Sequence, residues 1–145
     1  MTGVLKILLV EDDDVDVMNV QRALAKNGVE CVLDVACDGA GALQWLADAN
    51  DDALPHLVLL DLNLPRVNGI EFLTDLRGQS RLCHLPVVVL TTSDEERDVR
   101  AASRLNAAGY FVKPIGFPNF VALMASITAY WSESHHLGPG AVHEP

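Results

Sequence analysis

Acidic residues follow two runs of apolar residues, and their position suggests a chemical site. One apolar run ends in Asp61, and another, residues 5–10, is followed by Glu11, Asp12 and Asp13. Apolar runs of this length are typical of strands buried on both faces of a parallel sheet. In an open α/β sheet, ligands bind at the carboxyl ends of the strands. Crowded carboxylates there raise each other's pKa or bind a cation, so we expect a Mg²⁺ site for phosphoryl chemistry.

Strand-like and helix-like segments alternate five times along the chain, which predicts a parallel sheet covered by helices on both faces. Strands are expected at residues 5–10, 31–36, 57–61, 86–91 and 109–112. Helices are expected at residues 15–27, 39–49, 70–77, 94–106 and 118–132. The expected N-caps of the first two helices are Asp14 and Asp38, and that of the fourth is Ser93 or Asp94.

Length and charge limit the classes of function. The 145 residues suit one domain, expected at residues 1–133, followed by a flexible Gly- and Pro-rich tail at 134–145. No apolar stretch is long enough to span a membrane and no secretory signal is recognisable, so a cytoplasmic location is expected. The net charge of −10 argues against binding to nucleic acid or anionic lipid. The three cysteines are expected to be reduced and buried.

Two more strand ends carry polar side chains that suit phosphoryl transfer onto a carboxylate. Asp61 is the candidate nucleophile, because carboxylates form acyl phosphates. Lys113, after the fifth strand, can hold a phosphoryl oxygen as a point charge, and Thr91, at the end of the fourth, offers a hydroxyl. Each residue alone is more often a solvated acid, a β-branched strand end or a surface lysine. Their shared position at strand ends favours one common site.

With these motifs, the chain resembles the receiver domains of two-component response regulators over about residues 4–132. The resemblance is carried by residues 7–13, 59–65, 68–69, 86–92 and 109–114. It implies a flavodoxin-like fold, a doubly wound five-stranded parallel sheet in the order 2-1-3-4-5 with five flanking helices.

The resemblance also implies the phosphoacceptor and the Mg²⁺ ligands. Asp61 would accept the phosphoryl group. Asp12 and Asp61 would bind Mg²⁺ directly, Glu11 would bind it through water, and the backbone carbonyl of Asn63 would be a further ligand.

Three further residues correspond to functional positions of receivers. Thr91 and Tyr110 match the switch pair, in which Thr91 moves toward the phosphoryl group and Tyr110 fills the space it leaves. Lys113 matches the phosphoryl-binding lysine. The peptide bond between Lys113 and Pro114 is expected to be cis.

Four residues near the expected site bear on its details. Asn68 stands where receivers usually have Asp, and we expect it to take a left-handed turn with little effect. Thr92 stands where receivers usually have a smaller residue, so it is expected to slow the entry of small phosphodonors. Asn63 and Ser93 are expected to flank the route of the hydrolytic water.

These features predict a single-domain response regulator that takes a phosphoryl group from a sensor histidine kinase and catalyses only its own phosphorylation and dephosphorylation. A phosphotransfer protein is a candidate downstream partner. Within the family, the chain is similar to the small regulators that partner bacterial phytochromes. That similarity is carried by residues 14–16, 20–21, 61–65, 90–93 and 130–131.

Two other functions are weighed against this prediction. A Mg²⁺-dependent phosphatase with an aspartyl nucleophile often has a second acid two residues later, but Asn63 stands there and cannot transfer protons. A receiver that has lost its chemistry could act as a constitutive adaptor, but every expected chemical residue is present.

The last predicted helix has no charged residue between positions 116 and 132. Its core stripe is expected to consist of Phe120, Leu123, Met124, Ile127 and Trp131. The face opposite is apolar too, which marks an interface. We expect this face, with the fourth helix and fifth strand, to form a homodimer through Phe117, Val121, Ala125 and Thr128. The alternative is a monomer with a small, Ala-rich outer face.

Overall fold

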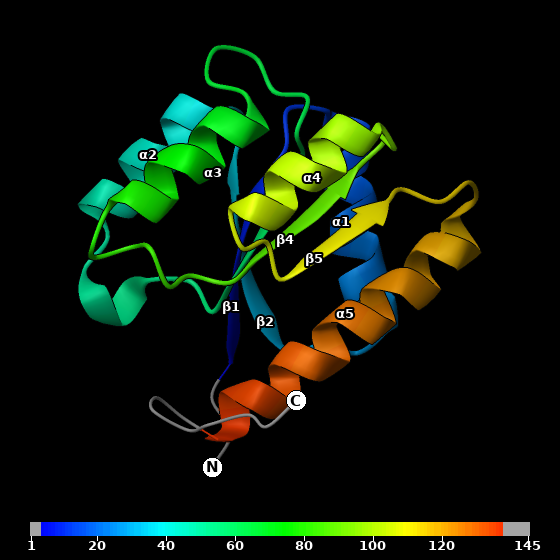
Figure 1. The fold of residues 1–145 in the computed structure, drawn as a ribbon. Helices are drawn as coiled ribbons and strands as arrows, with labels where there is room; N and C mark the ends of the chain where they lie inside the picture. The colour runs from blue at the N-terminus through cyan, green and yellow to red at the C-terminus, as the bar shows by residue number, and fades with distance from the viewer. Residues whose placement is uncertain (1–3, 138–145) are drawn as a thin grey trace.

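Five parallel strands form the centre of the molecule in the order β2-β1-β3-β4-β5 (Figure 1). They are β1 (Leu5–Val10), β2 (Cys31–Ala36), β3 (Leu57–Leu60), β4 (Val87–Thr91) and β5 (Gly109–Val112). This computed structural model describes residues 4–137. The predicted strand order and flavodoxin-like fold are confirmed.

Five α-helices cover the two faces of the sheet (Figure 1). Helices α1 (Asp14–Lys26) and α5 (Phe117–Leu137) pack together on one face. The other face carries α2 (Gly39–Asp48), α3 (Gly69–Gly78) and α4 (Glu96–Arg104). A short 3₁₀ helix, Asp51–Ala53, precedes β3. Every residue of β3 and β4 is buried, as expected for central strands covered on both sides.

The helix starts nearest the acidic residues are fixed by side-chain caps. Asp13, and not the predicted Asp14, caps α1, because its carboxylate accepts hydrogen bonds from the backbone N–H groups of Val15 and Asp16. Asp38 caps α2 as predicted, accepting from the N–H of Gly41 at 2.7 Å. Four consecutive acidic residues, 11–14, precede or begin α1, and only the backbone geometry decides which of them is its cap.

Asn68 behaves differently from the prediction. Its φ is −75°, and its side chain caps α3 in a capping box with Glu71. The left-handed residue of this loop is Arg66, with φ 62°. Gly69 allows a close approach at the same place, since a Cβ there would lie 2.5 Å from the Cα of Leu62. The conformation of the loop after β3 is therefore fixed by the capping box of Asn68 and Glu71 and by the close approach of Gly69 to Leu62.

Helices α4 and α5 differ from their predicted bounds. Helix α4 begins only at Glu96, and its N-cap residue is Glu95, which makes no side-chain capping bond, so both predicted caps were wrong. Helix α5 continues to Leu137, beyond the expected domain end at 133. Residues 138–145 of the expected tail lie outside the described residues.

Two smaller predictions were also wrong. The peptide bond before Pro114 is trans, which is the intrinsically preferred isomer, and Gly116 with φ 90° redirects the chain after it. Of the three cysteines, Cys37 and Cys83 are exposed because they lie in connecting segments, and Cys31 is half-buried. Among the described residues, no helix is both long and apolar enough to cross a membrane.

Candidate functional site

Three carboxylates meet at the carboxyl ends of β1 and β3. The backbone N–H of Asp61 donates to the carbonyl of Val10 at 3.1 Å, which holds the two strand ends side by side. As a result, Glu11, Asp12 and Asp61 each place an oxygen within 4.8 Å of the others. Glu11 and Asp61 are only 3 % and 7 % exposed, whereas Asp12 is open to solvent. The acidic site expected from the sequence is therefore present.

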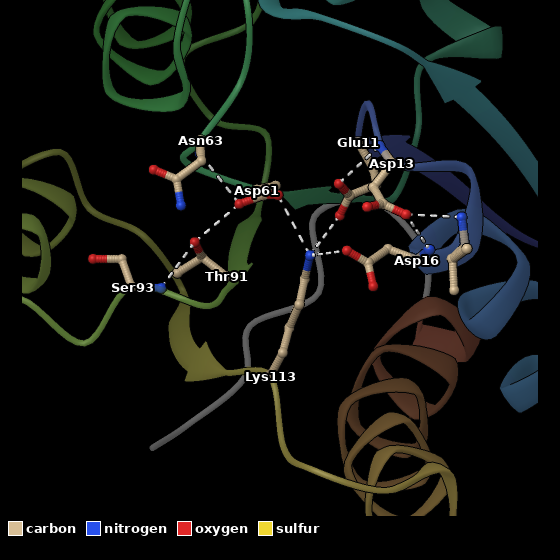
Figure 2. A network of polar contacts seen from close by, with 9 residues as sticks. Glu11, Asp13, Asp16, Asp61, Asn63, Thr91, Ser93 and Lys113 are labelled. Carbon is tan, nitrogen blue, oxygen red and sulfur yellow. Dashed lines mark hydrogen bonds and ion pairs between the residues drawn. The ribbon is translucent and has the colours of Figure 1, made fainter.

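The two carboxylate oxygens of Asp61 have different surroundings (Figure 2). Oδ1 accepts hydrogen bonds from the hydroxyl of Thr91 at 2.9 Å and from the backbone N–H of Asn63 at 3.2 Å. Oδ2 receives one longer contact, 3.4 Å, from the ammonium of Lys113. The backbone N–H of Lys113 donates to the carbonyl of Thr91, so β4 and β5 present both donors together. Of the two oxygens, Oδ2 therefore has the fewer and longer contacts.

Lys113 lies among several carboxylates. Its Nζ is 2.7 Å from Glu11 Oε1 and 2.9 Å from Asp16 Oδ2, in addition to its contact with Asp61. Burial of the ammonium acts to lower its pKa. The hydrogen bonds to Glu11 and Asp16 outweigh that effect and raise the pKa of Lys113 above its usual value. The lysine is therefore a permanent positive charge at this site.

Burial has the opposite consequence for Glu11. It raises the pKa of the Glu11 carboxyl to about 7, although the hydrogen bond and charge of Lys113 act to lower it. A carboxylate this buried is ionised most readily when a further cation is near it.

The residues around these carboxylates fit a hard divalent cation. The pocket is lined by Glu11, Asp12, Asp13, Asp14, Val15, Asp16, Asp61, Asn63, Thr92 and Lys113. Carboxylate and carbonyl oxygens are the ligands that such cations prefer. Lys113 is the one basic residue in this set, so the carboxylates exceed its charge. The donor set and the raised pKa of Glu11 both suit a bound cation.

The two predicted switch residues are joined through the loop that follows β4. Thr91 is buried, and its hydroxyl donates to Asp61 at 2.9 Å. The Tyr110 hydroxyl donates to the carbonyl of Ser93 at 2.8 Å, and the N–H of Ser93 lies 3.4 Å from Thr91 Oγ1. The hydroxyl of Ser93 donates to Asp98 at 2.6 Å, which directs it to α4.

The expected dimer residues are more buried than their sequence positions indicated. Thr128 is 2 % exposed, and its hydroxyl donates to the carbonyl of Met124 within α5, so its side chain is not on the outer face. Phe117 and Val121 pack partly against the core cluster beneath α1 and α5, and Ala125 is half-buried. Helical spacing alone did not reveal that α1 and the sheet together cover so much of α5.

Asp16, for which the sequence predicts no role in the site, contacts Lys113 at 2.9 Å. Asp16 lies in the first turn of α1, and the orientation of this turn over the strand ends is not contained in the sequence pattern.

Comparison with known proteins identifies the family. The model of the response regulator receiver domain matches residues 7–125. This chain belongs to that family. The match includes β2 to β5 in full, β1 from residue 7 and α5 as far as residue 125, so the site residues Glu11, Asp61, Thr91 and Lys113 of this receiver all lie inside it.

Two relatives, each matched over most of its length, support this assignment. The receiver is 38 % identical to the probable methanogenesis regulatory protein FilR2 of Methanothrix harundinacea, covering 86 % of this chain and 82 % of that protein. It is 35 % identical to the response regulator Rcp1 of Synechocystis, covering 88 % and 89 %.

Solved structures agree with the fold. The phosphorylated cyanobacterial phytochrome response regulator RcpA matches with a TM-score of 0.83 and 32 % identity, over 91 % of this chain and 96 % of that one. The Mn²⁺-bound form of Rcp1 matches with a TM-score of 0.80 and 33 % identity, over 97 % and 99 %. The chain is thus a receiver-domain response regulator, homologous to the phytochrome response regulators Rcp1 and RcpA.

Proposed function

We propose that this receiver accepts a phosphoryl group on Asp61 from a sensor histidine kinase. The observation that carries the proposal is that Thr91 and Lys113 both contact the carboxylate of Asp61, with Glu11 and Asp12 beside it. A buried carboxylate with a fixed ammonium and hydroxyl beside it is arranged to become an acyl phosphate.

The transfer uses the geometry of Asp61. One carboxylate oxygen attacks the phosphorus of a phosphohistidine, and the phosphorus–nitrogen bond breaks. The electron pair stays on the kinase imidazole, which takes up a proton. Oδ2 is the better placed oxygen, because its one contact is the 3.4 Å approach of Lys113. The Lys113 ammonium and the Thr91 hydroxyl then donate to phosphoryl oxygens, which stabilises the added charge.

Mg²⁺ is the proposed cation of this site. Asp12 and Asp61 would bind it directly, Glu11 through water, and Asn63 through its backbone carbonyl. When bound, it would offset the negative charge of the carboxylates and of the transferred group. The Mn²⁺-bound structure of Rcp1 supports a divalent cation in such a pocket.

The output of the proposed switch runs through Tyr110. Phosphorylation adds phosphoryl oxygens that accept a hydrogen bond from the Thr91 hydroxyl. The N–H of Ser93 lies close to the same hydroxyl, so a change in the hydrogen bonding of Thr91 acts on Ser93. Since Ser93 binds both Tyr110 and Asp98, a shift of this loop changes the surface formed by α4, β5 and α5.

The proposed kinase is a bacterial phytochrome, and the likeness to Rcp1 and RcpA supports this choice. A sensor kinase would dock where the pocket opens. Val15, which lines the pocket, is 63 % exposed and offers an apolar contact there, and Ile115, two residues after Lys113 in the chain, is 93 % exposed. A phosphotransfer protein remains the proposed downstream partner, and the proposed location is the cytoplasm.

We further propose that the α4–β5–α5 surface forms a homodimer, supported by the exposed valines Val99 and Val112 and by the position of β5 at a sheet edge. Val112→Asp should shift the protein to monomer in light scattering at micromolar concentration. Val112→Thr, which keeps the shape without charge, should leave the dimer intact. Val121 is unsuited to this test because it packs against the core. A wild-type monomer at these concentrations contradicts the dimer.

Labelling tests the proposed acceptor. Acetyl phosphate with MgCl₂ should place base-labile phosphate on the wild-type protein and none on Asp61→Asn. The same samples should not turn over an aryl phosphate, since no second proton-transferring acid follows Asp61 at position 63. Equal labelling of both proteins, or sustained aryl-phosphate turnover, would refute the proposed function.

A further inference from the structure

The three carboxylates that surround Lys113 are not equivalent. Glu11 and Asp61 belong to the carboxylate cluster that suits a cation, and Asp16 does not. The distances from Lys113 Nζ are 2.7 Å to Glu11, 2.9 Å to Asp16 and 3.4 Å to Asp61. An ammonium has three N–H donors, so each is directed at one of these carboxylates. Any new acceptor must therefore replace one of them.

The backbone of Asp16 is fixed by the N-terminal cap of α1. Its backbone N–H donates to the capping carboxylate of Asp13 at 3.1 Å, which leaves its own side chain free to reach Lys113 (Figure 2). Helix α1 in turn packs against α5. The Asp16 side chain is 33 % exposed, whereas that of Lys113 is 11 % exposed. The contact thus links a fixed helix start to a nearly buried ammonium.

The other two partners of Lys113 change when the site is loaded. A cation at the cluster competes with Lys113 for the oxygens of Glu11 and Asp61. A phosphoryl group on Asp61 changes the oxygen acceptor that Asp61 presents to the Lys113 ammonium. Among the described residues, Asp16 is the only ion-pair partner of Lys113 that lies outside both changes.

We propose that Asp16 is a positioning residue, which holds the Lys113 ammonium at the pocket edge while the cation and the phosphoryl group occupy its other partners. The part that concerns phosphorylation rests on the proposed function of Asp61. Without Asp16, the four-carbon side chain of Lys113 would lose its fixed acceptor, and fewer molecules would have the ammonium directed at the phosphoryl oxygen.

A purely electrostatic role is the competing explanation, and Asp14 provides the matched control for it. Asp14 lies in the same first turn of α1 and lines the same pocket. Within residues 4–137 it makes no ion pair with Lys113. Asp14→Asn and Asp16→Asn therefore remove the same charge from the same pocket, and only the second removes a contact of the lysine.

The first experiment follows the lysine itself and needs no phosphorylation. The reactivity of Lys113 toward limiting acetic anhydride is measured by mass spectrometry, with and without saturating MgCl₂. Asp16→Asn should react about three- to tenfold faster than wild type when MgCl₂ is present, because the contact is partly exposed and of modest strength. Asp14→Asn should match wild type, and Asp16→Glu should restore protection. Equal reactivity in Asp14→Asn and Asp16→Asn would overturn the proposal.

The second experiment measures phosphorylation by acetyl phosphate at saturating MgCl₂. Asp16→Asn should be slower by about three- to tenfold, with Asp14→Asn close to wild type and Asp16→Glu intermediate. Equal rates in Asp14→Asn and Asp16→Asn would overturn the catalytic part. If wild type takes up no phosphate while the lysine result holds, the role of Asp61 fails and the lysine-holding role of Asp16 stands.

Discussion

Asp61 Oδ1 accepts two hydrogen bonds, whereas Oδ2 has only a long contact with Lys113. This asymmetry orients the carboxylate before any phosphodonor arrives, because the hydroxyl of Thr91 and the N–H of Asn63 fix one oxygen and leave the other with a single contact. Such preorganisation lowers the cost of reaching the transition state.

Thr92 lines the pocket and is exposed at its entrance. Thr92→Ala should raise the rate of phosphorylation by acetyl phosphate by roughly two- to fivefold, because a smaller side chain widens the approach to Asp61. Stopped-flow fluorescence with MgCl₂ measures this rate. Thr92→Ser keeps the hydroxyl and removes the methyl group, so it should show part of the gain. An unchanged rate in both variants would show that Thr92 does not limit access.

Glu11 makes the stability of the metal-free protein depend on pH. Its pKa is about 7 in the folded protein, compared with the ordinary glutamate value of 4.5 expected for the unfolded chain. Because the folded state holds the proton more tightly, the stabilising contribution is complete below pH 4.5 and is lost as pH rises through 7. Without divalent cations, the free energy of unfolding should therefore contain a component that falls between these pH values.

Urea denaturation at a series of pH values in EDTA measures this component, and Glu11→Gln should lack it. Saturating MgCl₂ at pH 8 should stabilise wild type more than Glu11→Gln, because binding to the folded state adds to stability. The same pH profile in both proteins would contradict the shifted pKa.

The capped N-termini of α1 and α3 position residues of the site. Asp13 fixes α1, and with it Asp16 beside Lys113. Asn68 and Glu71 fix α3 after the loop that carries Asn63.

Asn68→Ala should lower the free energy of unfolding by about 1 kcal/mol, because it removes the accepting side chain of the capping box. Asn68→Asp should stay within a few tenths of a kcal/mol of wild type, since Asp caps equally well. Urea titration compares the three proteins. An equal loss in both variants would mean that the capping bond is not the source of the effect.

The elements also show which features the sequence can predict. The strands were located closely, because each is a short apolar run that ends in polar residues. Exact helix starts were less predictable where several capping residues are adjacent, as at Asp13 and Asp14, or where α4 begins without a side-chain cap. The exposure of α5 depends on contacts with α1 and the sheet, which helical spacing does not contain, so Thr128 was misplaced.

In the whole molecule, the parallel sheet brings residues from four strands to one edge. Strand-end position alone predicted that Glu11, Asp61, Thr91 and Lys113 would meet, because parallel strands end on the same side. It could not predict the contact of Asp16 with Lys113 or of Ser93 with Asp98, since these depend on how helices α1 and α4 are oriented over that edge.

Trapping of the acyl phosphate tests the central claim most directly. Wild-type protein is treated with acetyl phosphate and MgCl₂, reduced with borohydride, digested and sequenced by mass spectrometry. Borohydride converts a phosphorylated aspartate to homoserine, so the account predicts homoserine at position 61 in treated protein and aspartate there in untreated protein. Homoserine at another aspartate, or unreduced aspartate at position 61 in protein that carries phosphate, would contradict it.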